Sequence, residues 1–150
     1  MNTIENLGAA HLAMLDQADE LLKKEVLDLR EALWREAKER DKVLYRSFAI
    51  RQTALRLRVD WQVMNHYQHK GENKIAFTRI KLNKSKDTRP SYAQSKTYFQ
   101  KVDGFHADVL ARYDPLLATI REKADMIGNL RDQHIKLFNL AKATEGETLE

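Results

Sequence analysis

The most informative part of the sequence is LRLRVDWQV, residues 55–63, where apolar and polar side chains alternate strictly. The odd positions hold Leu55, Leu57, Val59, Trp61 and Val63, and the even positions hold Arg, Asp and Gln. Successive side chains of a β-strand point to opposite faces, so this period of two predicts a strand with one apolar face. We expect Leu57, Val59, Trp61 and Val63 to face helix side chains, because only one face of such a strand is buried.

A second strand is expected directly after a short polar turn. The turn HKGEN, residues 69–73, contains a glycine among polar neighbours, which suits a reversal of the chain. The segment KIAFTRIKL that follows is rich in β-branched and aromatic residues. Its apolar residues change face between Phe77 and Ile80, which suggests a bulge or twist near Thr78 and leaves the register open. Residues 50–82 therefore predict a basic β-hairpin.

Long helical segments flank the predicted hairpin. Residues 9–46 contain no proline, are rich in Leu, Ala, Glu, Lys and Arg, and repeat apolar residues at helical spacing. A helix of this length spans roughly 50 Å, so part of it should lie against another long helix. The second helical region covers residues 92–142, with a short helix over 92–102 at its start. Within it, Asp114-Pro115 either begins a new helix or kinks a continuous one.

The predicted fold is α+β and mainly α, with two long antiparallel helices and the hairpin at one end. A length of 150 residues is typical of a single domain. Residues 83–91 carry turn formers and basic side chains without apolar periodicity, so they predict an exposed basic connection. The tail, residues 143–150, is expected to fray.

Charge divides the chain into two parts. Residues 46–101 hold 13 Lys or Arg against three acidic residues, a net charge of +10. The rest of the chain holds 13 basic and 19 acidic residues, a net charge of −6. This asymmetry suggests two surfaces with different partners.

Several classes of function lack their usual sequence signals. The chain contains no cysteine, no nucleophile or phosphate-loop motif and no His-Glu-x-x-His pattern, so we expect neither an enzyme nor a bound metal or cofactor. It also has no long apolar run and no recognisable secretory signal, which favours a cytoplasmic protein without membrane contact.

The basic central segment suits nucleic acid. Each Lys or Arg that neutralises a phosphate releases counterions, and a two-stranded ribbon can enter a major groove. The alternative is a solvated polar face of a half-buried hairpin. The candidate DNA-binding residues are Arg56, Arg58, Lys70, Lys74, Arg79, Lys81, Lys84, Lys86, Arg89 and Lys96.

Different parts of this segment suit different contacts. Strands fix side-chain direction, so we expect sequence preference from Arg56, Arg58, Arg79 and Lys81, with Arg56 and Arg58 projecting opposite the apolar set. The connection over residues 83–91 suits phosphate instead. Asp60 lies on the same face as Arg58 and would repel phosphate unless it pairs with a neighbouring arginine or accepts from a cytosine amino group. Trp61 shares the apolar face, so we expect it in the core rather than against a base.

The order of features resembles the MobI-type auxiliary proteins of conjugative elements over roughly residues 50–130. The resemblance rests on the strand LRLRVDW, the segment SYAQSK at residues 91–96 and the helix LLATIREKADMI at residues 116–127. It implies recognition of double-stranded DNA at an origin of transfer and assistance to a separate relaxase, with no catalysis by this chain. The helices would dimerise or hold that partner. Two alternatives stay open: a helical scaffolding protein, and an RNA-binding regulator if the aromatic residues are exposed.

Overall fold

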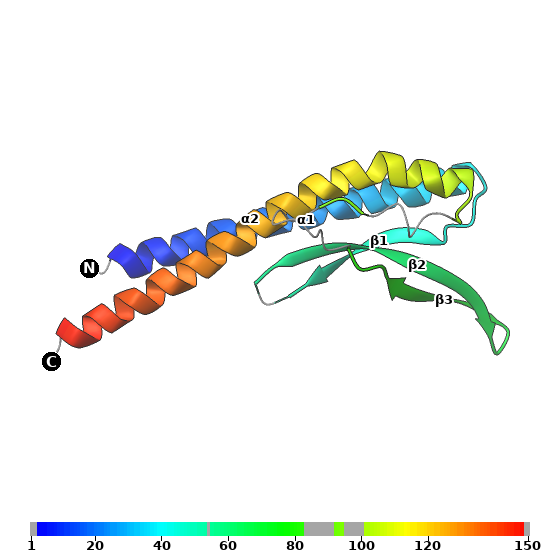
Figure 1. Cartoon of the computed structure of the whole chain (residues 1–150). Helices are drawn as coiled ribbons and strands as arrows, with labels where there is room; N and C mark the ends of the chain where they lie inside the picture. Colours follow the sequence, from blue (N-terminus) through cyan, green and yellow to red (C-terminus); the bar gives the residue numbers. More distant parts are fainter. Residues whose placement is uncertain (1–2, 54, 83–91, 95–100, 149–150) are drawn as a thin grey trace.

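The computed structural model describes residues 3–53, 55–82, 92–94 and 101–148. Two long helices pack beside a three-stranded antiparallel sheet, which confirms the predicted α+β, mainly α class (Figure 1). The elements in chain order are α1 (Thr3–Glu39), β1 (Arg46–Gln52), β2 (Leu57–His69), β3 (Glu72–Arg79) and α2 (Gly104–Thr148). The strand order within the sheet is β1-β2-β3.

The helices form an antiparallel pair that is longer than the sheet. At about 1.5 Å per residue, the 37 residues of α1 and the 45 of α2 span roughly 55 Å and 67 Å. The sheet lies along one side of the pair, and the outer ends of both helices, where the chain begins and ends, extend past it (Figure 1). Arg131 of α2 joins the helices through Asp16, at 2.7 Å, and Asp19, at 2.5 Å.

Helix α1 ends earlier than predicted. The sequence suggested a helix to residue 46, but α1 ends at Glu39 because the backbone of Asp41 adopts a left-handed conformation, with φ of 51°. The Lys42 amide then donates to the Ala37 carbonyl at 2.8 Å, and the Asp41 amide donates to the Lys38 carbonyl at 3.2 Å. This pair of bonds is a Schellman motif, which usually has glycine at the left-handed position. Because aspartate stands at that position, the sequence lacks the glycine that would have indicated the end of the helix.

Strand β1 was not predicted at all. It pairs antiparallel with β2, with Phe48 opposite Trp61 and Ile50 opposite Val59. Its apolar residues Phe48, Ala49 and Ile50 are consecutive rather than alternating, so they give no signal of period two. The two-stranded hairpin is therefore part of a larger sheet in which β2 is central.

The hairpin itself is confirmed. Lys70 and Gly71 both have positive φ, 51° and 80°, as a two-residue type I′ turn requires. The pairing is continuous from Gln62 opposite Arg79 to His69 opposite Glu72, so the expected bulge near Thr78 is wrong. Ile80 lies just beyond β3, where it is buried and its amide donates to the Trp61 carbonyl at 2.8 Å.

Helix α2 also differs from its prediction. It begins at Gly104 and runs as one helix through Pro115 to Thr148, although we expected fraying from residue 143. Residues 92–94 are not helical, so the short helix predicted from residue 92 does not begin there, while residues 95–100 lie outside the described part. Asp103 caps α2, because its Oδ1 accepts from the His106 amide at 2.9 Å.

The core forms where β2 meets both helices. Leu57, Val59 and Trp61 are buried as predicted, whereas Val63 is only half-buried and Met64 is buried instead. Trp61 is completely enclosed and its indole nitrogen donates to Asp114 Oδ1 at 2.8 Å. Its role as a core residue is therefore confirmed.

A buried charge network closes this region. Arg121 donates to Asp114 Oδ1 at 3.1 Å, to the Val59 carbonyl at 2.9 Å and to the Tyr92 carbonyl at 2.8 Å. The other Asp114 oxygen accepts from the Gln94 amide at 2.8 Å. Asp114 therefore holds the sheet and the segment before α2, instead of starting a helix at Pro115.

Candidate nucleic-acid interface

The outer face of the sheet carries three arginines around one aspartate. Because Leu57, Val59 and Trp61 face the helices, Arg58 and Asp60 of β2 point away from them. The register places Arg51 of β1 opposite Arg58, and Arg79 of β3 opposite Gln62. Directly opposite residues share a face, so the arginines come from three different strands onto one surface. We call Arg51, Arg58, Asp60 and Arg79 the arginine face.

The charge of Asp60 is neutralised within this face. Its Oδ2 lies 3.2 Å from Arg51 Nε and 3.9 Å from Arg79 Nη1, and its side chain is 16% exposed. Arg58 is exposed and forms no ion pair with any described residue. The pairing that the sequence required for Asp60 is therefore present, and the arginine face keeps a net charge of +2.

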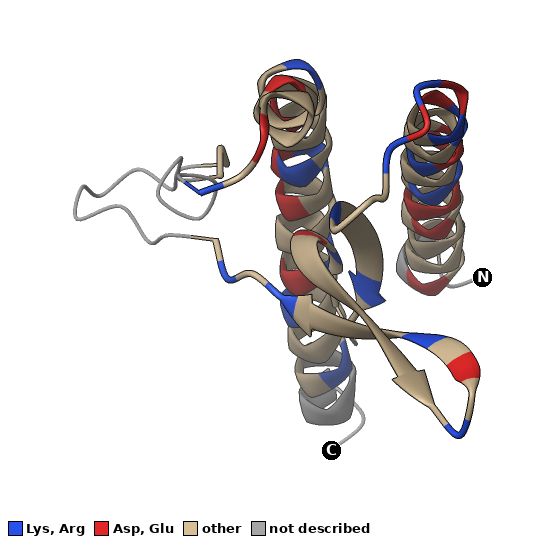
Figure 2. Cartoon of the chain, turned by 90° about the vertical axis from the view of Figure 1, so that its right-hand side faces the viewer, with Lys and Arg blue, Asp and Glu red and all other residues tan. Residues whose placement is uncertain are grey.

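The hairpin extends this surface away from the helices. All eight residues of β3 are exposed, as are Lys70, Gly71 and the last residues of β2. Figure 2 shows the hairpin projecting beyond both helices, with basic positions along it and one acidic position near its tip. Lys70 and Lys74 supply positive charge there against Glu72. An arm exposed on both faces can enter a groove without a clash from the helices.

Two aromatic residues of the hairpin are also exposed. Tyr67 is 47% and Phe77 is 50% exposed. Tyr67 pairs with Lys74, whereas Phe77 pairs with Met64, so the two rings lie on opposite faces of the ribbon. They cannot form one stacking platform for successive bases.

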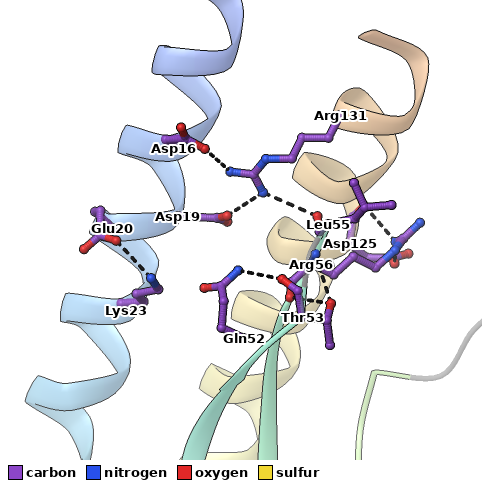
Figure 3. Close-up of polar contacts among 10 residues, drawn as sticks. All are labelled: Asp16, Asp19, Glu20, Lys23, Gln52, Thr53, Leu55, Arg56, Asp125 and Arg131. Atoms are coloured by element: carbon purple, nitrogen blue, oxygen red, sulfur yellow. Dashed lines mark hydrogen bonds and ion pairs between the residues drawn. The ribbon is translucent and has the colours of Figure 1, made fainter. Parts of the chain in front are cut away.

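Arg56 does not belong to this surface. We predicted it on the outer face of a strand, but it precedes β2 and its side chain points to α2 (Figure 3). Its guanidinium pairs with Asp125, donates to Asn129 Oδ1 at 2.7 Å, and lies 3.3 Å from Asp132 Oδ2. The prediction that Arg56 projects opposite the apolar face is therefore wrong. Two carboxylates of α2 already neutralise this arginine, so it is not part of the arginine face.

The remaining candidates fall into two groups. Lys81 is exposed just after β3, next to the arginine face in sequence. Lys84, Lys86, Arg89 and Lys96 lie outside the described residues, as does the predicted basic connection over 83–91. Sequence reasoning missed Arg51, because its place beside Arg58 becomes visible only once β1 is known to pair with β2.

Among the described residues, no three His, Asp or Glu side chains are grouped closely enough to hold a metal ion. None of the described helices combines the length and apolar character needed to cross a membrane. Comparison with known proteins found no matching family model, no matching curated protein and no matching solved structure.

Proposed function

We propose that this protein binds double-stranded DNA through the arginine face and the projecting hairpin. The observation that carries the proposal is the neutralisation of Asp60 by two arginines beside an exposed Arg58 that forms no ion pair with any described residue. Over residues 46–82, eight basic residues face two acidic ones, and Arg56 is committed to α2. Phosphate is the counter-charge that such a surface attracts.

The two parts of the surface would make different contacts. Arg58 is held by the central strand of the sheet, so its direction is fixed as readout of a guanine edge requires. Lys70 and Lys74 lie on the hairpin arm and would contact phosphates on either side of the groove. In this arrangement the sheet positions the protein on DNA, and Arg58 supplies sequence preference.

The biological role that we infer is that of an accessory factor for conjugative transfer. It rests on the resemblance to MobI-type proteins in the strand LRLRVDW and the helix LLATIREKADMI. In that role the chain would bind an origin of transfer and assist a relaxase, and it would supply no catalytic group.

A second candidate is binding of single-stranded RNA, which the exposure of Tyr67 and Phe77 favours. The two rings lie on opposite faces, so at most one of them could stack on a given strand of bases. This geometry makes duplex DNA the better-supported ligand.

The test compares labelled duplex from a transfer origin, random duplex and single-stranded RNA at two salt concentrations. We expect duplex to bind more tightly than RNA, with affinity that falls steeply as salt rises. Arg58→Ala should lose about 1–3 kcal/mol of discrimination between cognate and random duplex. The control is Arg35→Ala, an equal charge change at an exposed arginine of α1.

Each outcome separates the readings. Preference for RNA would replace the DNA proposal with the second candidate. Equal losses on cognate and random duplex would show that Arg58 only positions the protein. Equal effects of Arg58→Ala and Arg35→Ala would remove the arginine face from the interface.

A further inference from the structure

Among the described side chains, eleven large apolar ones lie exposed on the two helices, and six of these repeat at intervals of four or seven residues. On α1 they are Leu7, Met14 and Leu21, which follow one another at intervals of seven residues. On α2 they are Met126, Leu130 and Leu137, at intervals of four and seven. All six are between 42% and 69% exposed. We call them the apolar face.

Helix geometry places all six on the side of the pair opposite the sheet. Met14 and Leu21 each precede a buried core residue by one position, and Leu130 precedes the buried Arg131. Asp125 and Asp132 of α2, which bind Arg56 in the connection between β1 and β2, instead follow a core position by one residue. One residue turns a helix by about 100°, so these two sets point to opposite sides. In an antiparallel pair, residues that precede the core on either helix share one side.

The three residues of α1 also lie beside the three residues of α2 along the helix axes. A Cβ on Gly8 would come within 2.8 Å of His134, and Arg131 binds Asp16 and Asp19. These contacts set Leu7 beside Leu137 and Met14 beside Leu130, with Leu21 and Met126 next along the pair. The apolar face therefore consists of three levels along the helix pair, each with one side chain from α1 and one from α2. At the first level, a pocket of about 250 Å³ opens between the helices, lined by Leu7, Gly8, His11, His134, Leu137 and Phe138.

Two opposite charges lie next to the third level of the apolar face. Glu25 follows Leu21 by four residues and precedes the core residue Val26, and Lys123 precedes the core residue Ala124. Both are exposed. They occupy the next position of the apolar face on α1 and on α2, so one helix ends its row with an acid and the other with a base.

We propose that a second copy of this chain covers the apolar face, with α1 of each copy lying on α2 of the other in a four-helix bundle. Intervals of four and seven residues are those of a helical seam, so the covering element is a helix. A two-fold axis parallel to the helices stacks equal levels and brings Glu25 of one copy to Lys123 of the other. This self-complementarity is what an isologous dimer requires, and it selects a second copy as the occupant.

The size of the face agrees with this assignment. From Leu7 to Glu25, 19 residues of α1 cover roughly 28 Å, and two adjacent helices are roughly 20 Å wide. The projected area is on the order of 600 Å², close to the ~800 Å² that each partner buries in a stable interface.

The experiment is sedimentation equilibrium of the full chain over a wide concentration range, without nucleic acid. We expect a mass twice the 17.5 kDa of one chain. The variant Met14→Glu with Leu130→Glu should raise the dissociation constant at least about 100-fold, because it places four charges in the seam of a dimer. Its matched control is Leu27→Glu with Ile135→Glu, two exposed apolar residues that follow the buried Val26 and the half-buried His134 and lie outside the apolar face.

A charge exchange tests the arrangement of the helices. Glu25→Lys alone and Lys123→Glu alone should each weaken the dimer, and the double exchange should restore it. A wild-type mass of 17.5 kDa at every concentration would overturn the proposal, as would equal effects of the test and control pairs. Failure of the double exchange to restore the dimer would overturn the pairing of α1 with α2. Circular dichroism checks that each variant is folded, and no result depends on DNA binding.

Discussion

The hydrogen bonds of His106 define its protonation state. The Tyr45 amide donates to His106 Nε2 at 3.2 Å, so Nε2 accepts and carries no proton. The proton is on Nδ1, which donates to Asp103 Oδ1 at 2.8 Å. The ring is fully enclosed, and this burial lowers the pKa of His106, while the neighbouring Asp103 partly opposes the change. The amide of His106 in turn lowers the pKa of Asp103.

This geometry predicts a loss of stability in mild acid. A histidine whose pKa is lowered by folding binds its proton more readily in the unfolded chain. The contribution of His106 to the free energy of unfolding is therefore complete above the ordinary pKa of about 6.5 and is lost as pH falls below that value. The melting temperature should therefore fall between about pH 7.5 and pH 5. His106→Gln should flatten that slope, and His69→Gln, at an exposed position, should leave it unchanged. Equal slopes in both variants would contradict this role of His106.

Trp61 should carry a large share of the stability of the core. Trp61→Ala removes a fully buried ring and the donor to Asp114, so we expect a loss of about 3–5 kcal/mol in the free energy of unfolding. Phe77→Ala, at the half-exposed ring of the hairpin, should cost less than about 1 kcal/mol. Chemical denaturation measures both, and similar losses would contradict the assignment of Trp61 to the core.

Among the helices, strands and turns, those with a pattern in neighbouring residues could be predicted from the sequence. Strand β2 was predictable because it buries one face over several residues, and the turn was predictable because Gly71 supplies a positive φ. The end of α1 and strand β1 were not, because Asp41 replaces the usual glycine and the apolar residues of β1 do not alternate. Arg56 was misplaced because its partner Asp125 lies 69 residues away, and a pattern of neighbouring residues cannot show that contact.

The turn between β2 and β3 offers a test of the hairpin that does not involve the core. Gly71→Ala should cost about 1–2 kcal/mol, because a Cβ disfavours the left-handed backbone at that position. Hydrogen exchange should show faster exchange in β3 and unchanged protection in α2, since β3 is fully exposed and contributes little to the core. Gly104→Ala is the control, because a Cβ there meets open space at the start of α2. Faster exchange throughout the molecule would contradict an independent hairpin arm.

For the whole molecule, the division of charge along the chain becomes a division in space. The basic segment, residues 46–101, includes the whole sheet and its hairpin, and the remainder with its net charge of −6 consists mainly of the helices. A polyanion would attract the sheet and repel the helices, so the molecule would approach DNA hairpin first. The proposed dimer would leave both sheets uncovered and facing in opposite directions, because the apolar face of each copy lies on the side opposite its sheet.

The start of α1 and the end of α2 lie together, at the end of the helix pair that extends past the sheet (Figure 1). A mechanical load applied between the two chain ends would therefore peel the helices apart instead of sliding them past each other. The contacts would open in sequence, beginning where Gly8 meets His134 and reaching the Arg131 ion pairs with Asp16 and Asp19 before any strand is disturbed. The same layout leaves room for a tether at either end, well away from the hairpin.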